Sequence, residues 1–180
     1  MNFKAFALTV ATATSIIAAP AAEARGTFNE HIQLGNAVKS TGVSLQYNPM
    51  SCDEKPGAMG WYWSARSELV VCQENHQASD GYWNEVQWTE EDLDTLRHEA
   101  QHLIQDCMDG SRNSRLGSVY KDPVTLAKGT LSQAHINKIV ESYTNDSASE
   151  HVVIMELEAF SVAAMNDPAE QIRDINKFCF

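Results

Sequence analysis

The sequence predicts an α+β fold in a single domain, with a small N-terminal β-hairpin or sheet packed on one long helix and further helices toward the C-terminus. Residues 89–109 repeat apolar side chains at the 3.6-residue period of a helix. Short aromatic or β-branched runs precede this stretch, at 43–47, 61–63 and 69–72. Segments with helix-capping residues follow it. This order of strands and helices is typical of an α+β domain.

The first residues form a segment typical of a secretory signal peptide. Lys4 gives the positive end, residues 5–19 are uncharged and mostly apolar, and Ala22-Glu23-Ala24 is a small-x-small cleavage site. We expect cleavage after Ala24, which divides the chain into a signal peptide, 1–24, and a single domain, 25–180. The apolar run is short for a span of about 20 residues. The mature protein is therefore expected to be secreted or periplasmic, without a membrane span.

The net charge of the chain argues against two classes of partner, nucleic acid and anionic membranes. The formal net charge is −11, and it stays at −11 when Lys4 and Glu23 leave with the signal peptide. A chain this acidic repels nucleic acid and anionic membranes. We therefore expect neither as a partner.

The first mature elements are a helix and three short strands. Residues 27–41 read as a helix, with Thr27 and Glu30 as a capping box and Gly42 just past its end. Val43, Leu45 and Tyr47 alternate as in a strand, and the runs 61–63 and 69–72 read as a hairpin. Residues 73–88 are polar and read as a loop, in which Tyr82, Trp83 and Trp88 are expected to be packing anchors.

The C-terminal part is predicted to be mainly helical. Residues 110–129 have the Gly, Ser and Asn content of a loop that is long enough to cover a cleft. A helix over 130–143 is expected to begin with a capping box of Thr130 and Gln133. The next is expected to begin at Ser147 and run toward Met165, and the last to begin at 167–168.

The four cysteines all lie in the mature part and permit three disulfide pairings. Cys52 and Cys72 bracket the predicted strand pair, whereas Cys107 ends the central helix and can fix the C-terminal Cys179. These two pairs are the favoured ones. A zinc site made of thiolates is the competing use, but the sequence holds no CxxC pair.

The central helix carries the residues that point to chemistry. Thr89 and Asp92 form an N-cap pair, and the apolar stripe that follows includes Leu93, Leu96, Ala100 and Leu103. His98 and His102 stand about 40° apart, roughly opposite the middle of that stripe. Two imidazoles one turn apart can bind one metal ion, and Glu99 can take a proton from a water bound to it. The five residues 98–102 are the motif HExxH, flanked by uncharged or apolar residues.

A third protein ligand is needed, and the sequence offers two carboxylates on the helix after Ser147. A third His in the extended form of the motif is excluded, since the positions hold Gln105 and Met108. Glu156 has only apolar residues at its helical neighbour positions, so ionising it needs a cationic partner such as a metal. Glu158 lies in a similar apolar environment and stays open as the alternative.

The HExxH helix followed by the segment from Glu156 to Ala163 resembles the gluzincin superfamily of zinc metallopeptidases. In its third-ligand helix a Glu precedes a small residue by three positions, as Glu156 precedes Ala159 here. The resemblance implies that His98, His102 and Glu156 are the zinc ligands. Several gluzincin families have Asp or Asn where this chain has Phe160, so a residue that supports the histidines is not identified.

The order of the elements is also similar to the minimal gluzincin layout, over about two thirds of the mature chain. In that layout the last strand before the HExxH helix is an edge that binds an extended peptide. The resemblance implies hydrolysis of peptide bonds in a peptide or protein substrate, with Zn²⁺ as the cofactor and Glu99 as the general base. A second stabiliser of the oxyanion is usually a Tyr or His. The sequence leaves this role open among four residues: Tyr120, Tyr143, His135 and His151.

Two other classes of function compete with this interpretation. The chief alternative is a non-catalytic metal-binding or peptide-binding domain that keeps the gluzincin layout. The other is a structural protein held by disulfides and without metal, which predicts zinc at well under one atom per chain.

Overall fold

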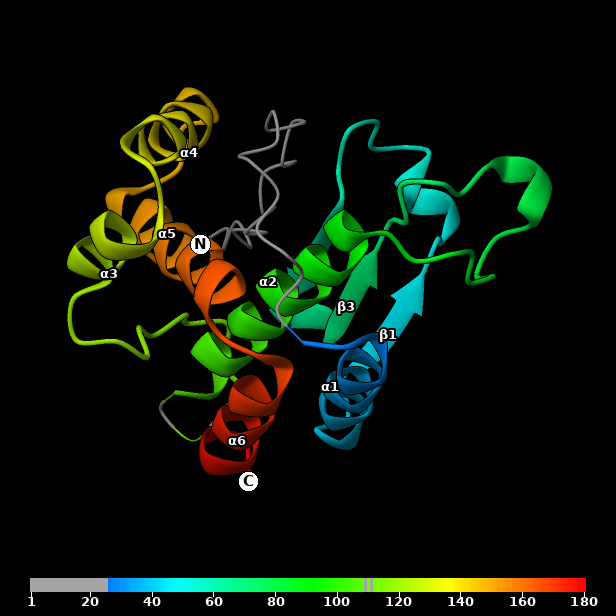
Figure 1. The fold of residues 1–180 in the computed structure, drawn as a ribbon, viewed down its shortest axis with the longest axis horizontal. Coiled ribbons are helices and arrows are strands. Elements are labelled where there is room, and N and C mark those ends of the chain that lie inside the picture. The colour runs from blue at the N-terminus through cyan, green and yellow to red at the C-terminus, as the bar shows by residue number, and fades with distance from the viewer. Residues whose placement is uncertain (1–25, 109, 111) are drawn as a thin grey trace, which may run out of the picture.

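Helix α2, Glu90–Cys107, runs through the centre of the molecule, between a small β-sheet and helix α5, Glu150–Met165 (Figure 1). The computed structural model describes residues 26–180 apart from 109 and 111, so the predicted signal peptide, 1–24, lies outside the described residues. Six α-helices and a three-stranded sheet make up this part of the chain. The predicted α+β class is therefore confirmed.

The first helix, α1 (Phe28–Ser40), packs on α2 and begins as predicted. The Thr27 side chain accepts a hydrogen bond from the backbone N–H of Glu30, and the Glu30 carboxylate accepts one from that of Thr27. Gly42 follows the helix at φ +84°, a conformation that glycine adopts at little cost.

The sheet has the order β1-β3-β2, with β1 at Ser44–Tyr47, β2 at Gly60–Trp63 and β3 at Glu68–Val71. The predicted hairpin is present, since β2 pairs with β3 in antiparallel fashion. The expectation that the last strand is an edge is wrong, because β1 pairs in parallel with the other side of β3. Leu69, Val70 and Val71 are fully buried, as expected for a central strand covered on both faces. The edges of this sheet are β1 and β2.

Two of the three hydrophobic clusters in the described residues lie on opposite sides of the central helix. The larger joins α1, the sheet, α2 and α6 (Pro168–Phe178), with residues that include Leu34, Leu69, Leu103 and Ile175. The second joins α3 (Pro123–Thr130), α4 (Gln133–Asn145) and α5, with Ala127, Ile139 and Leu157. The surface between α2 and α5 is where these two parts of the domain meet.

The helices after α2 correct three predictions about their boundaries. The predicted loop 110–129 contains most of α3, because Asp122 caps a helix whose first residue is Pro123. Helix α4 is capped by Ser132 instead of Thr130, and α5 by Ser149 instead of Ser147. Ser147 itself has φ +62° and therefore lies in a turn before the helix. The last helix begins after Asp167, as predicted.

Both predicted disulfides are present. Cys107–Cys179 joins the end of α2 to the residue that follows α6, and Cys52–Cys72 joins the segment after β1 to the end of β3. Two disulfides fit a protein of an oxidising compartment.

Within the part of the chain that the structure covers, none of the helices is long and apolar enough to cross a membrane. Short 3₁₀ turns occur at Met50–Cys52, Ser64–Arg66 and Ala78–Asp80.

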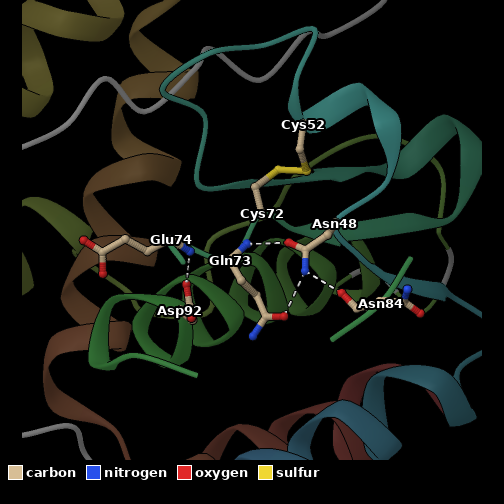
Figure 2. Close-up of a disulfide and its surroundings, with 7 residues drawn as sticks. All are labelled: Asn48, Cys52, Cys72, Gln73, Glu74, Asn84 and Asp92. Carbon is tan, nitrogen blue, oxygen red and sulfur yellow. Dashed lines mark hydrogen bonds between the residues drawn. A yellow bond between two sulfur atoms is a disulfide. The ribbon is translucent and has the colours of Figure 1, made fainter. Parts of the chain in front are cut away.

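The segment 73–88 projects beyond the sheet but is fixed at its base by buried polar side chains (Figures 1 and 2). Asn48 accepts a hydrogen bond from the Gln73 backbone N–H and donates to the Gln73 side chain and to the Asn84 carbonyl. Asp92 of α2 accepts from the Glu74 backbone N–H. Trp88 packs edge-on against Tyr47, as predicted, whereas Trp83 is 63% exposed, so its prediction as a packing anchor is wrong.

Candidate functional site

The two histidines of the HExxH motif project from α2 toward α5. The helix forms as expected, with Thr89 and Asp92 as a capping box and three acidic residues in its first turn. Its apolar stripe faces the larger hydrophobic cluster, so His98 and His102 face the other side. There they meet Glu156 of α5, and all three side chains are buried.

The three predicted ligands converge on one point. His98 Nε2 and His102 Nε2 lie 3.1 Å apart, and Glu156 Oε2 lies 3.2 Å from the first and 3.4 Å from the second. Among the described residues this Glu156 oxygen has no hydrogen-bond partner. Two ring nitrogens and a carboxylate oxygen of this kind could hold a metal ion.

The charges of the three groups favour a cation at this point. Burial alone disfavours an imidazolium, but the neighbouring Glu156 carboxylate outweighs it and raises the pKa of His102 to about 9. Burial likewise disfavours a carboxylate at Glu156, but His102 and His98 reverse the shift and lower the pKa of that carboxyl. The site therefore keeps its carboxylate ionised and attracts positive charge.

Glu99 lies beside the three groups, on the side of the sheet. Its carboxyl is buried, and strand β2 approaches its side chain at Gly60. Burial is the main cause of a raised pKa at Glu99, against the lowering effect of the two histidines. Its Oε2 atom has no hydrogen-bond partner in the described part of the chain. A buried carboxyl of this kind is suited to accept and return a proton.

A glycine allows β2 to approach Glu99. A Cβ atom at Gly60 would lie 2.6 Å from the Val70 carbonyl oxygen, 2.7 Å from Thr95 Cγ2 and 3.3 Å from Glu99 Cγ. No side chain fits into that space without a shift of the strand or the helix. Gly60 therefore sets the distance between the edge strand and the HExxH helix.

The structure separates the four candidates for the oxyanion stabiliser. Tyr143 of α4 is buried, and burial, followed by the charge of Glu156, raises the pKa of Tyr143. His135 lies about two turns before Tyr143 on the same helix and contacts the ring of Phe160. The Phe160 ring in turn packs on His98, with the ring centroids 4.3 Å apart. Tyr120 and His151 bond elsewhere, to Asn166 and the Leu116 carbonyl. Tyr143 is the candidate that interacts electrostatically with a predicted ligand, Glu156.

Glu158, the alternative ligand, points away from the histidines. It is fully buried and accepts hydrogen bonds from five groups on two other segments of the chain. These donors are the side-chain amides of Gln101 and Gln105, the Ser118 hydroxyl and the backbone N–H groups of Val119 and Tyr120. Of the two carboxylates that the sequence left open, the structure therefore brings only Glu156 to the histidines.

Gln105 is a site residue that the sequence did not reveal. Its side-chain oxygen lies 2.8 Å from His102 Nδ1. The one available signal was spacing, because residues three apart on a helix are neighbours, but a glutamine is an uncommon partner for a metal-binding histidine.

Comparison with known proteins places the chain in a family. Residues 26–180 match the family described as a domain of unknown function, DUF8637, and the chain belongs to it. No curated protein matches the sequence, and no solved structure matches it either.

Proposed function

We propose that this member of the DUF8637 family is an exported zinc metallopeptidase of the gluzincin type, which hydrolyses peptide bonds in a peptide or protein substrate. The observation that carries the proposal is the convergence of His98, His102 and Glu156 from two helices, with Glu99 of the HExxH motif beside them. All four of these residues are buried, and the ligand atoms of the first three lie within 4.8 Å of one another. The two disulfides support export, together with the signal peptide expected at 1–24.

The spacing of the three ligand atoms fits zinc. Zinc binds nitrogen and oxygen at about 2.0–2.1 Å in tetrahedral sites, which separates the ligand atoms by about 3.3 Å. The separations here are 3.1, 3.2 and 3.4 Å. Two neutral imidazoles and one carboxylate are also a donor set that zinc prefers over magnesium or calcium. Three protein ligands are the number found in catalytic zinc sites, which keep one position for water.

The side chains divide the work of hydrolysis. When bound, zinc lowers the pKa of a coordinated water toward about 7 and polarises the substrate carbonyl. Glu99 takes a proton at its unpartnered oxygen and later hands it to the leaving amine. The edge strand β2 packs against the Glu99 side chain at Gly60. Tyr143, which interacts electrostatically with Glu156, is our candidate for the group that faces the oxyanion.

The test separates binding of zinc from chemistry. Glu99→Gln should keep one zinc per chain and lose about 10²–10⁴-fold in hydrolysis, because the amide cannot act as a base. His98→Ala should lose both zinc and hydrolysis. Glu90→Gln, a change at an exposed glutamate of the same helix, is the matched control and should keep both. The measurements are metal content of the purified mature protein and cleavage of a panel of unfolded proteins with and without a chelator.

Each other outcome has a definite meaning. A Glu99→Gln variant with full activity would end the proposed mechanism. Wild-type protein with one zinc per chain and no chelator-sensitive cleavage would favour the non-catalytic metal-binding or peptide-binding domain. Zinc well below one atom per chain would favour a structural protein held by its disulfides.

A further inference from the structure

The hydrogen bonds around Gln105 determine which end of its amide faces the metal site. The Gln105 Nε2 group donates to the Met155 carbonyl at 3.0 Å and to Glu158 Oε1 at 3.1 Å. Both partners are acceptors only, when Glu158 is ionised, so the NH₂ end of the amide must point to them. The oxygen of Gln105 must then point to the other side, where it lies 2.8 Å from His102 Nδ1.

That orientation dictates the tautomer of His102. Because an amide oxygen can only accept, the hydrogen bond requires a proton on Nδ1. In the neutral imidazole the other nitrogen, Nε2, is then unprotonated and offers its lone pair to a cation. This Nε2 atom is the one that faces His98 and Glu156.

Glu158 is itself held in place by the chain around it. Besides Gln105, it accepts from Gln101 of α2 and from three consecutive residues of the segment before α3, Ser118, Val119 and Tyr120. The Gln105 carbonyl also accepts from the backbone N–H of Gly117, at 2.8 Å. The carboxylate is therefore fixed by donors on two segments, and it cannot turn away from Gln105 without leaving buried donors unpaired.

We propose that Gln105 is the positioning residue of His102, and that Glu158 acts through it. The pair would replace the carboxylate that often contacts a metal-binding histidine directly: the amide fixes the ring and its tautomer, and the buried carboxylate fixes the amide. This inference rests on the proposed metal site. It also gives Glu158 a role distinct from that of Glu156, although both are buried acids on the same helix.

Gln101 supplies a matched control within the chain. Its side-chain Nε2 donates to the same Glu158 oxygen at the same 3.1 Å, and it is equally buried, but none of its hydrogen bonds reaches His102. Gln105→Met and Gln101→Met therefore each remove one donor from Glu158, whereas only Gln105→Met removes the partner of the imidazole. The comparison separates the effect on His102 from the loss of one donor to Glu158.

The first readout is the affinity for zinc, measured by competition with a chromogenic chelator at one fixed pH. We expect Gln105→Met to bind zinc about 10–100-fold more weakly than the wild type, as for other partners of metal-binding histidines. Gln101→Met should bind close to wild-type affinity. Equal affinities of the two variants would overturn the inference and leave the proposed function intact, whereas a wild-type protein that binds no zinc would overturn both.

The second readout uses the wild-type protein, so it does not depend on the folding of a variant. In zinc-loaded protein labelled with ¹⁵N-histidine, the Nδ1 proton of His102 should exchange slowly with water, because it is buried and bonded to Gln105. Absence of a protected Nδ1 proton at His102, with the zinc bound, would overturn the inference. Where Gln105→Met folds, the same proton should exchange faster than in Gln101→Met.

Discussion

His31 is a fully buried histidine at the contact between α1 and α2, and it must stay neutral there. Its Nδ1–H donates to the Thr27 carbonyl at 2.8 Å, and its Nε2 accepts from the buried guanidinium of Arg97 at 3.4 Å. Burial is the main cause of a lowered pKa at His31; the Thr27 carbonyl opposes the shift, and the charge of Arg97 adds to it. A proton on Nε2 would place two positive groups side by side.

The stability of the fold should therefore depend on pH through this residue. The unfolded chain takes up a proton at His31 near pH 6.5, before the folded protein does. Its contribution is fully present above that pH and is lost as the pH falls through 6.5 toward the lowered pKa of the folded state. We expect the free energy of unfolding to fall less between pH 7.5 and 5.5 in His31→Gln than in the wild type. Urea titrations at several pH values measure the two slopes, and equal slopes would contradict the prediction.

At the scale of single residues the sequence indicated the side chains that converge between α2 and α5, but not the residues that hold them in place. HExxH and the apolar environment of Glu156 were sufficient to name four residues that the structure brings together. Glu156 and Glu158 were hard to separate, because both lie on a helix that is apolar on nearly every face. What distinguishes them is the chain segment 118–120, which reaches Glu158 only in the folded molecule. No pattern along the sequence carries that information.

At the scale of elements, the contact between β2 and α2 depends on a residue without a side chain. A methyl group at Gly60 would lie 2.7 Å from Thr95 Cγ2 of α2 and 2.6 Å from the Val70 carbonyl oxygen of β3, so the strands or the helix would have to move. We expect Gly60→Ala to lower the free energy of unfolding by about 1–3 kcal/mol, the usual cost of overpacking. Chemical denaturation measures this loss.

Gly129 provides the control for this substitution. It lies within α3, and a Cβ atom there would meet nothing within 4 Å. Gly129→Ala should therefore be neutral or stabilise the protein by up to about 1 kcal/mol, since alanine favours a helix. If both variants lose stability to the same extent, the close approach of β2 to α2 is not what Gly60 serves.

The first residue of a helix was predictable where only one nearby residue could serve as its cap. The capping boxes at Thr27 and Thr89 and the Asp-Pro start of the last helix are confirmed. The region before α4 offered several Ser, Thr and Asp residues in succession, each able to cap a helix. Competition among equivalent caps explains why α4 and α5 begin later than expected, whereas the Gly, Ser and Asn content of 110–129 concealed α3.

At the scale of the whole molecule, the two disulfides should differ in their contribution to stability. Cys107–Cys179 spans 72 residues of sequence and Cys52–Cys72 spans 20. In the chain-entropy account, the longer loop contributes about 4 kcal/mol and the shorter about 3 kcal/mol. We expect the Cys107→Ser, Cys179→Ser double variant to unfold at lower urea concentration than the Cys52→Ser, Cys72→Ser variant. The reverse order would show that local contacts outweigh the restriction of the unfolded chain.

The arrangement of the elements was predictable only in part. Alternation and hydrophobic runs indicated three strands, and the all-apolar β3 could have suggested a central position. The parallel pairing of β1 with β3 depends on contacts across some two dozen residues, for example between Ser44 and Glu68. The separation of the two larger hydrophobic clusters, with the site between α2 and α5, likewise arises from packing between distant segments.

The fixed base of segment 73–88 has a consequence for an enzyme that would share its compartment with other copies of itself. A peptidase cuts a chain that can be drawn out as an extended strand, and a projecting segment of this kind could be a site of cleavage. Its backbone is tied at Trp83, Asn84 and Val86 by bonds to Asn48 and Gln73, so it resists being drawn out. The hydrogen bonds of Asn48 and Gln73 would thus protect segment 73–88 against cleavage by other copies of the protein.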